Sequence, residues 1–343
     1  MTTTARQTIA RSSRLRRTAG LGALLVTTAL VATACGAENE GGGGGDDNTG
    51  SDVSAYEDCT PGEDSADLAD LDTDDDKEIS VAAFNGWDES FAASHLLKHV
   101  LEEDGYTVDI TGYDAAPAYT GVAQGDIDLF MDGWLPITHD NYIEQYGDDM
   151  EAQGCWYDNA VLTLAVNEDS PAQEIGDLAT MGDEYDNTLV GIDPGAGLTS
   201  QTQDHAIPEY ELDNLDFQIS STPAMLAALK RATDSGDNIA VTLWRPHWAY
   251  DAFPVRDLED PKGAMGEEEI IYNFSRSGFS DDNPYVSQLL KNLVINDENL
   301  SSLENVMFSE DNYGGENLDD AVAEWVEDNP EFVEDWRAGQ LGE

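Results

Sequence analysis

The alternation of strand-like and helix-like segments, repeated twice along the chain, constrains the fold more than any other feature of this sequence. In the first set, residues 78–84 and 106–110 are short apolar or alternating runs, as expected of strands. Between them, residues 91–103 read as an amphipathic helix whose apolar face carries Leu96, Leu97, Val100 and Leu101. A second set follows, with strands expected at 189–192 and 238–243 and a helix at 224–231.

Alternating strands and helices predict parallel sheets joined by right-handed crossovers. Two such sets predict two lobes, one formed by about 77–163 with 252–343 and the other by about 164–251. Beyond Trp248 the pattern is helical and polar. Because ligands of open α/β sheets bind outside the carboxyl ends of the strands, we expect an α/β fold with a ligand cleft between its lobes.

The first 34 residues have the order of an export signal. Five arginines without an acidic residue precede an apolar stretch at 21–34, which is too short for a convincing membrane span; a weak anchor helix is the alternative. The run from Ala32 to Gly36 resembles a bacterial lipoprotein cleavage box, which would make Cys35 the lipid-bearing first residue of the mature chain. A free thiol at Cys35 is the other interpretation, and the export route stays open between the general and twin-arginine pathways.

The segment 35–76 is rich in Gly, Asp, Glu and Ser. Low hydrophobicity and dense like charge keep such segments disordered, so we expect a flexible tether between the lipid and a domain at 77–343. Cys59 and Cys155 remain in the mature chain. Export places them where disulfides persist, so a bridge between them is possible, with one buried and one exposed thiol as the alternative.

Charge excludes several partners. The chain has 15 basic and 71 acidic residues, a net charge of −56, and removing the five leader arginines leaves 10 basic residues and a charge of −61. Nucleic acid and anionic lipid headgroups are therefore excluded as partners. The acids are scattered along the whole domain, as on the surface of a protein adapted to high salt, where screening acts within about 3 Å at 1 M.

Three tryptophans follow predicted strands directly: Trp87, Trp134 and Trp244. A single tryptophan at such a place is more often a core residue, but three at equivalent places favour an aromatic cage. Each indole face attracts a cation with about 0.5 to 2 kcal/mol. A quaternary ammonium suits such a cage because it has no N–H group that would be left unpaired.

A place for an anion is predicted opposite the cage. The run Asp193 to Leu198 leads from a strand into a helix, so the backbone N–H groups of Gly197 and Leu198 can point at an anion, although an ordinary turn would look the same. His139 follows Trp134 closely enough to donate a hydrogen bond to that anion. No metal cluster, activated nucleophile or phosphate loop is evident, so we expect neither catalysis nor a cofactor.

Six stretches of the sequence carry a resemblance to the glycine betaine and proline betaine substrate-binding proteins of ABC importers. They are Asn85 to Ser90, Val100 to Tyr106, Gly125 to Asp128, Trp134 to His139, Gly191 to Gly197, and Trp244 to Trp248. The resemblance implies a type II-like periplasmic-binding-protein fold, no enzymatic activity, and an extracellular, membrane-anchored protein that delivers its ligand to a permease and ATPase.

The resemblance also implies roles for single residues. Trp87, Trp134 and Trp244 would form the cage, and His139 with the N–H groups of Gly197 and Leu198 would hold the ligand's carboxylate. Some members place a cage tryptophan where this chain has Ala196, so the comparison follows the members that use Trp87. Choline or carnitine as the ligand, an enzyme of choline or betaine metabolism, and a surface sensor or adhesin module remain as alternatives.

Overall fold

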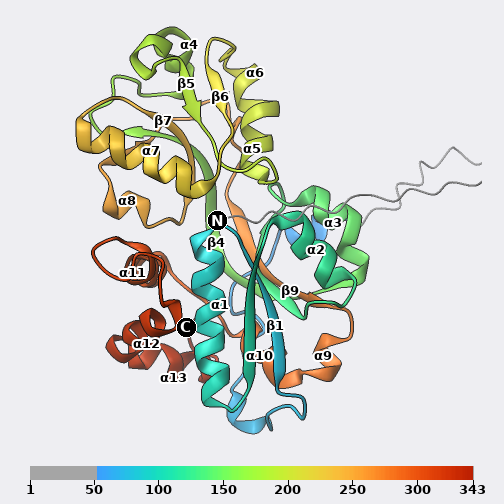
Figure 1. Ribbon diagram of the computed structural model, residues 1–343. Helices are drawn as coiled ribbons and strands as arrows, with labels where there is room; N and C mark the ends of the chain where they lie inside the picture. The colour runs from blue at the N-terminus through green and yellow to red at the C-terminus, as the bar shows by residue number, and fades with distance from the viewer. Residues whose placement is uncertain (1–51, 343) are drawn as a thin grey trace, which may run out of the picture. The chain divides into compact units, whose positions relative to one another are not determined.

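The computed structural model describes residues 52–342 (Figure 1). The expected export signal at 1–34, Cys35 and the start of the tether lie outside the described residues. One mixed sheet has the strand order β2-β1-β3-β9-β4-β7-β5-β6, and β8 also pairs with β4. The two-lobed α/β architecture is as expected, because the sheet divides into two halves that share one strand.

Strand β4 (Met150–Asn167) is the shared strand. Residues 150–160 of β4 pair with β9, and residues 161–166 pair with β7. We call the half on the β9 side the first lobe and the half on the β7 side the second lobe. The remaining strands of the first lobe are β1 (Glu78–Phe84), β2 (Thr107–Tyr113), β3 (Leu129–Leu135) and β9 (Glu269–Arg276). Those of the second are β5 (Thr188–Val190), β6 (Asp216–Gln218), β7 (Ala240–Arg245) and β8 (Val255–Asp257).

Strand directions correct the expectation of purely parallel sheets. β1 runs parallel to β2 and β3, and β5 runs parallel to β6 and β7. However, β9 is antiparallel to both β3 and β4, and β4 is antiparallel to β7. Strand β9 was also missed, in a region that the sequence pattern marked as helical.

Helices pack on the sheet and on one another (Figure 1). The helices of the first lobe are α1 (Asp88–Glu103), α2 (Ala115–Ala123), α3 (Asp140–Tyr146), α9 (Phe279–Asp282), α10 (Pro284–Lys291), α11 (Asp297–Phe308), α12 (Leu318–Asp328) and α13 (Pro330–Ala338). Those of the second lobe are α4 (Leu178–Met181), α5 (Gly197–Gln201), α6 (Ile207–Glu209), α7 (Thr222–Ser235) and α8 (Ala249–Ala252). Short 3-10 turns and one π-helical turn at Thr202–Ala206 complete the described elements.

The apolar face of α1 is as the sequence predicted. Leu96, Leu97, Val100 and Leu101 have no exposed surface. Burying a leucine or valine side chain stabilises a fold by about 1.5 to 3 kcal/mol, so this face anchors the helix. The start of α1 at Asp88, directly after Trp87, is therefore fixed in position relative to the sheet.

The chain stays with the second lobe beyond the expected boundary at residue 251. Residues 255–257 form β8, which pairs with residues 165–167 of β4. Glu174 and Glu259 form a further bridge. These residues belong to the second lobe because β4 offers them a free edge there, and the return to the first lobe is completed by β9.

The expected tether is wrong for residues 52–76, which pack against the domain. A disulfide joins Cys59 to Cys155. Asp74 is 6% exposed, and its carboxylate accepts hydrogen bonds from the Tyr106 hydroxyl and the Tyr285 N–H, both at 2.9 Å. The acidic composition suggested disorder, but the covalent bridge and this buried carboxylate hold the segment in place.

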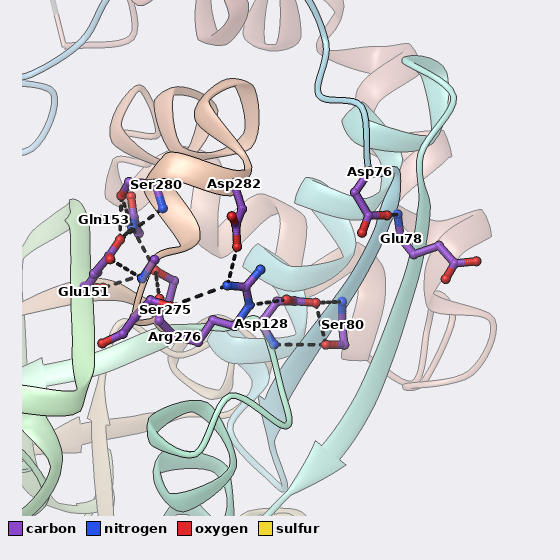
Figure 2. A network of polar contacts seen from close by, with 12 residues as sticks. Asp76, Glu78, Ser80, Asp128, Glu151, Gln153, Ser275, Arg276, Ser280 and Asp282 are labelled. Atoms are coloured by element: carbon purple, nitrogen blue, oxygen red, sulfur yellow. Dashed lines mark hydrogen bonds and ion pairs between the residues drawn. The ribbon is translucent and has the colours of Figure 1, made fainter.

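A polar network ties the strands of the first lobe together near their ends (Figure 2). Asp128 accepts hydrogen bonds from the backbone and the hydroxyl of Ser80 at 2.8 and 2.7 Å and from Arg276 at 2.9 Å. Arg276 also donates to Asp282 at 2.8 Å. In the same view, Glu151 accepts from the hydroxyl of Ser280 at 2.8 Å. The network fixes β1, β4, β9 and α9 relative to one another.

Candidate ligand-binding site

One pocket is lined by residues of both lobes. Its walls are mainly aromatic and apolar. The lining residues are Trp87, Glu89, Trp134, Thr138, His139, Leu162, Ile192, Ala196, Gly197, Leu198 and Trp244. The structure therefore brings together every residue that the sequence predicted to touch the ligand, and adds five that sequence reasoning missed.

The three tryptophans reach the pocket from different elements. Trp87 precedes the first residue of α1, whereas Trp134 and Trp244 lie within β3 and β7. The expectation that all three follow their strands is thus wrong for two of them. Trp134 pairs with Ile271 of β9, and Trp244 pairs with Leu162 of β4. All three side chains are buried, with 3 to 7% of their surface exposed, so the pocket is shielded from water.

His139 is held in one orientation by Trp134. The Trp134 N–H donates to His139 Nδ1 at 2.9 Å, and the His139 N–H donates to the Trp134 carbonyl at 3.0 Å. Because Nδ1 accepts, the proton of the neutral ring sits on Nε2. Burial lowers the pKa of His139 to about 3, so the ring stays neutral at physiological pH. Nε2 has no partner among the described residues, and it supplies a hydrogen-bond donor at the pocket.

Two buried carboxyl groups lie beside the tryptophans. Asp132 accepts a hydrogen bond from the indole N–H of Trp134 at 2.7 Å. Glu89, in the first turn of α1, lines the pocket and is 2% exposed. Burial raises the pKa of Glu89 well above its usual value, and the negative charges of Asp132 and Glu304 raise it further. An ionised Glu89 on this side of the pocket would suit a cation.

The loop that carries Thr138 is fastened by Glu269 of β9. One Glu269 oxygen accepts the N–H groups of Ile137 at 2.9 Å and of Thr138 at 2.7 Å, and the other accepts the Thr138 hydroxyl. Burial raises the pKa of Glu269, while these hydrogen bonds lower it. Sequence reasoning missed Glu269 because it lies more than 130 residues from the loop that it orders.

The two lobes touch at the turn before α5, opposite this loop. A Cβ atom added to Gly197 would lie 2.2 Å from the carbonyl oxygen of Thr138. The Tyr142 hydroxyl also donates to the Gly195 carbonyl at 3.3 Å. The N–H groups of Gly197 and Leu198 belong to the first turn of α5, where helical hydrogen bonding leaves them free. We call this arrangement, with the lobes in contact, the closed form, and only a glycine fits at position 197 in it.

Within residues 52–342, no group of three or more His, Cys, Asp or Glu side chains is placed to hold a metal ion. The same part of the chain has no helix with the length and apolar character of a membrane span.

Known proteins share both the sequence and the fold of this chain. Residues 77–328 match the model of the substrate binding domain of ABC-type glycine betaine transport systems. The glycine betaine/carnitine transport binding protein GbuC of Listeria monocytogenes is 36% identical over 161 residues, which are 46% of this chain and 52% of that relative. The chain therefore spans about half the length of this curated relative.

Solved structures agree with this match over most of the described residues. Lactococcal OpuAC, in its closed form with glycine betaine, has a TM-score of 0.69 at 28% identity and covers 76% of this chain and 99% of its own. ProX of Borrelia burgdorferi gives 0.70 at 27% identity, covering 78% and 100%. A choline-binding protein in complex with choline gives 0.67 at 25% identity, covering 78% and 96%. The fold is the mixed α/β type II fold of periplasmic binding proteins. This chain belongs to the family of substrate-binding domains of ABC-type glycine betaine transport systems, whose members are binding proteins and not enzymes.

Proposed function

We propose that this protein binds glycine betaine in the pocket between its lobes and delivers it to the permease and ATPase of an ABC importer. The observation that carries the proposal is the single pocket in which three buried indoles, a neutral histidine donor and the free N–H groups of α5 converge. The indoles of Trp87, Trp134 and Trp244 would surround the trimethylammonium group. Family membership supports the same substrate class.

The carboxylate of the ligand would lie at the opposite side of the pocket. His139 would donate from Nε2, and Gly197 and Leu198 would donate from the backbone. Hydrogen bonds to a charged acceptor contribute about 1.5 to 3 kcal/mol each, so this subsite would separate betaines from quaternary ammonium ions without a carboxylate. Choline is the alternative ligand, since a related solved structure holds choline.

The experiment that tests the carboxylate subsite compares two ligands. Choline has the quaternary head of glycine betaine but no carboxylate, so we expect it to bind at least about tenfold more weakly. His139→Ala should narrow that gap by weakening betaine and leaving choline nearly unchanged. Calorimetric titration of both proteins with both ligands measures the four affinities. Choline binding as tightly as betaine to the native protein would move it to another substrate class.

Glu89 makes the binding of a cation depend on pH. Its raised pKa means that it holds a proton at a higher pH than an ordinary glutamate. A quaternary ammonium nearby favours the ionised form, so ligand binding should release a proton and affinity should rise with pH. His139, with its pKa lowered to about 3, contributes no such dependence above pH 5.

Titrations between pH 5 and 9 check this expectation. Glu89→Gln keeps the shape of the side chain and should give an affinity that rises less with pH than that of the native protein. A native affinity that does not change over the same range would contradict the role of Glu89.

Lipid anchoring at Cys35, cell-surface localisation and salt adaptation complete the proposal. Cys35→Ser should release the protein from the membrane, as fractionation of cells would show.

A mature charge of −61 repels itself more strongly as the screening length grows from about 3 Å at 1 M to about 10 Å at 0.1 M. We expect the melting temperature to fall as sodium chloride is lowered, well before the affinity of the folded protein changes. A melting temperature indifferent to salt would contradict the adaptation.

A further inference from the structure

Trp248 of the second lobe donates both of its N–H groups to carboxylates of the first lobe. The indole N–H donates to Asp88 at 2.5 Å, and the backbone N–H donates to Glu304 of α11 at 2.9 Å. Asp251, three residues further along, accepts a hydrogen bond from Ser301 of the same helix. The segment after β7 is therefore bound to two helices of the other lobe, α1 and α11.

These contacts adjoin the tryptophan cage at two points in the chain. Asp88 follows Trp87 directly, and Trp248 lies four residues after Trp244. Trp248 is 7% exposed and packs against Phe253 with ring centres 5.6 Å apart. The indole N–H is thus held in a fixed direction, and its bond to Asp88 joins the segments that carry two of the three cage residues.

In the closed form, Trp248 donates hydrogen bonds to the carboxyl groups of Asp88 and Glu304. In the closed form Glu304 has no exposed surface, and one of its oxygens has no partner among the described residues. Separation of the lobes would break the two hydrogen bonds of Trp248 and admit water between their partners. A buried acceptor that loses its donor is destabilised, whereas a hydrated one is not. The two hydrogen bonds donated by Trp248 therefore stabilise the closed form and not the open form.

We propose that Trp248 is a positioning residue of the binding site, which latches the lobes through Asp88 and Glu304 and so determines how long a ligand stays enclosed. None of the three residues of the latch lines the pocket. The predicted effect on ligand dissociation rests on the proposed binding of betaine. The predicted effect on the distance between the lobes does not.

The test uses Trp248→Phe, which keeps a buried ring but removes the indole donor. The distance between the lobes is measured by pulsed electron spin resonance, with spin labels on cysteines that replace the exposed Glu184 and Glu327. A Cys35→Ser background leaves no other free thiol, because Cys59 and Cys155 are bonded. We expect a smaller closed fraction than in the native protein, both without ligand and with glycine betaine. Betaine should dissociate about 10- to 100-fold faster, with little change in its association rate.

Trp325→Phe is the matched control. The Trp325 indole is 2% exposed and donates to Ser302 at 3.0 Å within the first lobe, so this change also removes one indole hydrogen bond. It should lower the melting temperature and leave the distances between the lobes unchanged. Asp88→Ala supplies a second variant, and the double variant with Trp248→Phe should lose no more than either single change, because both remove the same bond.

The outcomes separate the latch from the proposed function. If betaine fails to bind while Trp248→Phe still lowers the closed fraction of the ligand-free protein, the latch stands and the substrate is wrong. Equal closed fractions in native and Trp248→Phe proteins, without ligand and with it, would overturn the latch. Additive losses in the double variant would overturn it as well.

Discussion

Gly197→Ala is expected to weaken betaine binding about 100-fold while leaving the melting temperature of the ligand-free protein nearly unchanged. The added methyl group would lie 2.2 Å from the Thr138 carbonyl oxygen and 2.5 Å from its methyl group. Thr138 cannot retreat easily, because Glu269 holds its N–H and its hydroxyl. Overpacking of this kind costs about 1 to 3 kcal/mol, and here the cost falls on the closed form, since the open form separates the two residues.

Gly195→Ala in the same turn is the control for that experiment. A Cβ atom there would meet only the carboxylate of Asp193, at an ordinary contact distance of 3.6 Å. We expect native affinity for this variant by calorimetric titration. If both alanine variants bind as the native protein does, the contact between Gly197 and Thr138 does not limit closure.

Trp134→Ala is expected to reduce betaine affinity by about 100-fold and to lower stability as well. The change removes one wall of the cage, worth about 0.5 to 2 kcal/mol of attraction to the cation. It also takes the indole donor away from Asp132, which has no exposed surface and whose second oxygen already has no partner among the described residues. Leaving a buried acceptor unpaired costs about 1 to 3 kcal/mol.

Trp325→Ala separates the two effects of the Trp134 change. Trp325 is a buried tryptophan that packs on Phe332 within the first lobe, with ring centres 5.2 Å apart. Its loss should lower the melting temperature and leave the affinity of the folded protein nearly intact. Thermal unfolding and calorimetric titration of both variants provide the comparison, and equal losses of affinity would remove Trp134 from the site.

The sequence predicted the elements that carry short-range signals. The face of α1 was recognised because Leu96, Leu97, Val100 and Leu101 recur with the period of a helix. The six residues expected to bind the ligand line one pocket, and each stands near the end of a strand or the start of a helix, where α/β folds place their sites. The local sequence pattern alone was enough to predict the buried face of α1 and the position of these pocket residues.

Features that depend on pairing distant segments were missed. Strand β9 joins β3 and β4 from more than a hundred residues away, and Glu269 at its start orders the Thr138 loop. The packing of residues 52–76 depends on the partners of Cys59 and Asp74, and composition alone pointed to disorder. The role of Glu89 could not be found either, since the cause of its raised pKa is burial next to Asp132 and Glu304.

The pocket is expected to bind a quaternary ammonium group for its positive charge and not only for its shape. Glycine betaine and 3,3-dimethylbutanoate test it directly, because the second molecule has the same shape and carboxylate but a neutral carbon in place of the nitrogen. Calorimetric titration of the native protein with both should show betaine binding at least about tenfold more tightly, since each of the three cage indoles contributes cation attraction. Equal affinities would contradict this expectation, because the indoles would then act only as an apolar wall.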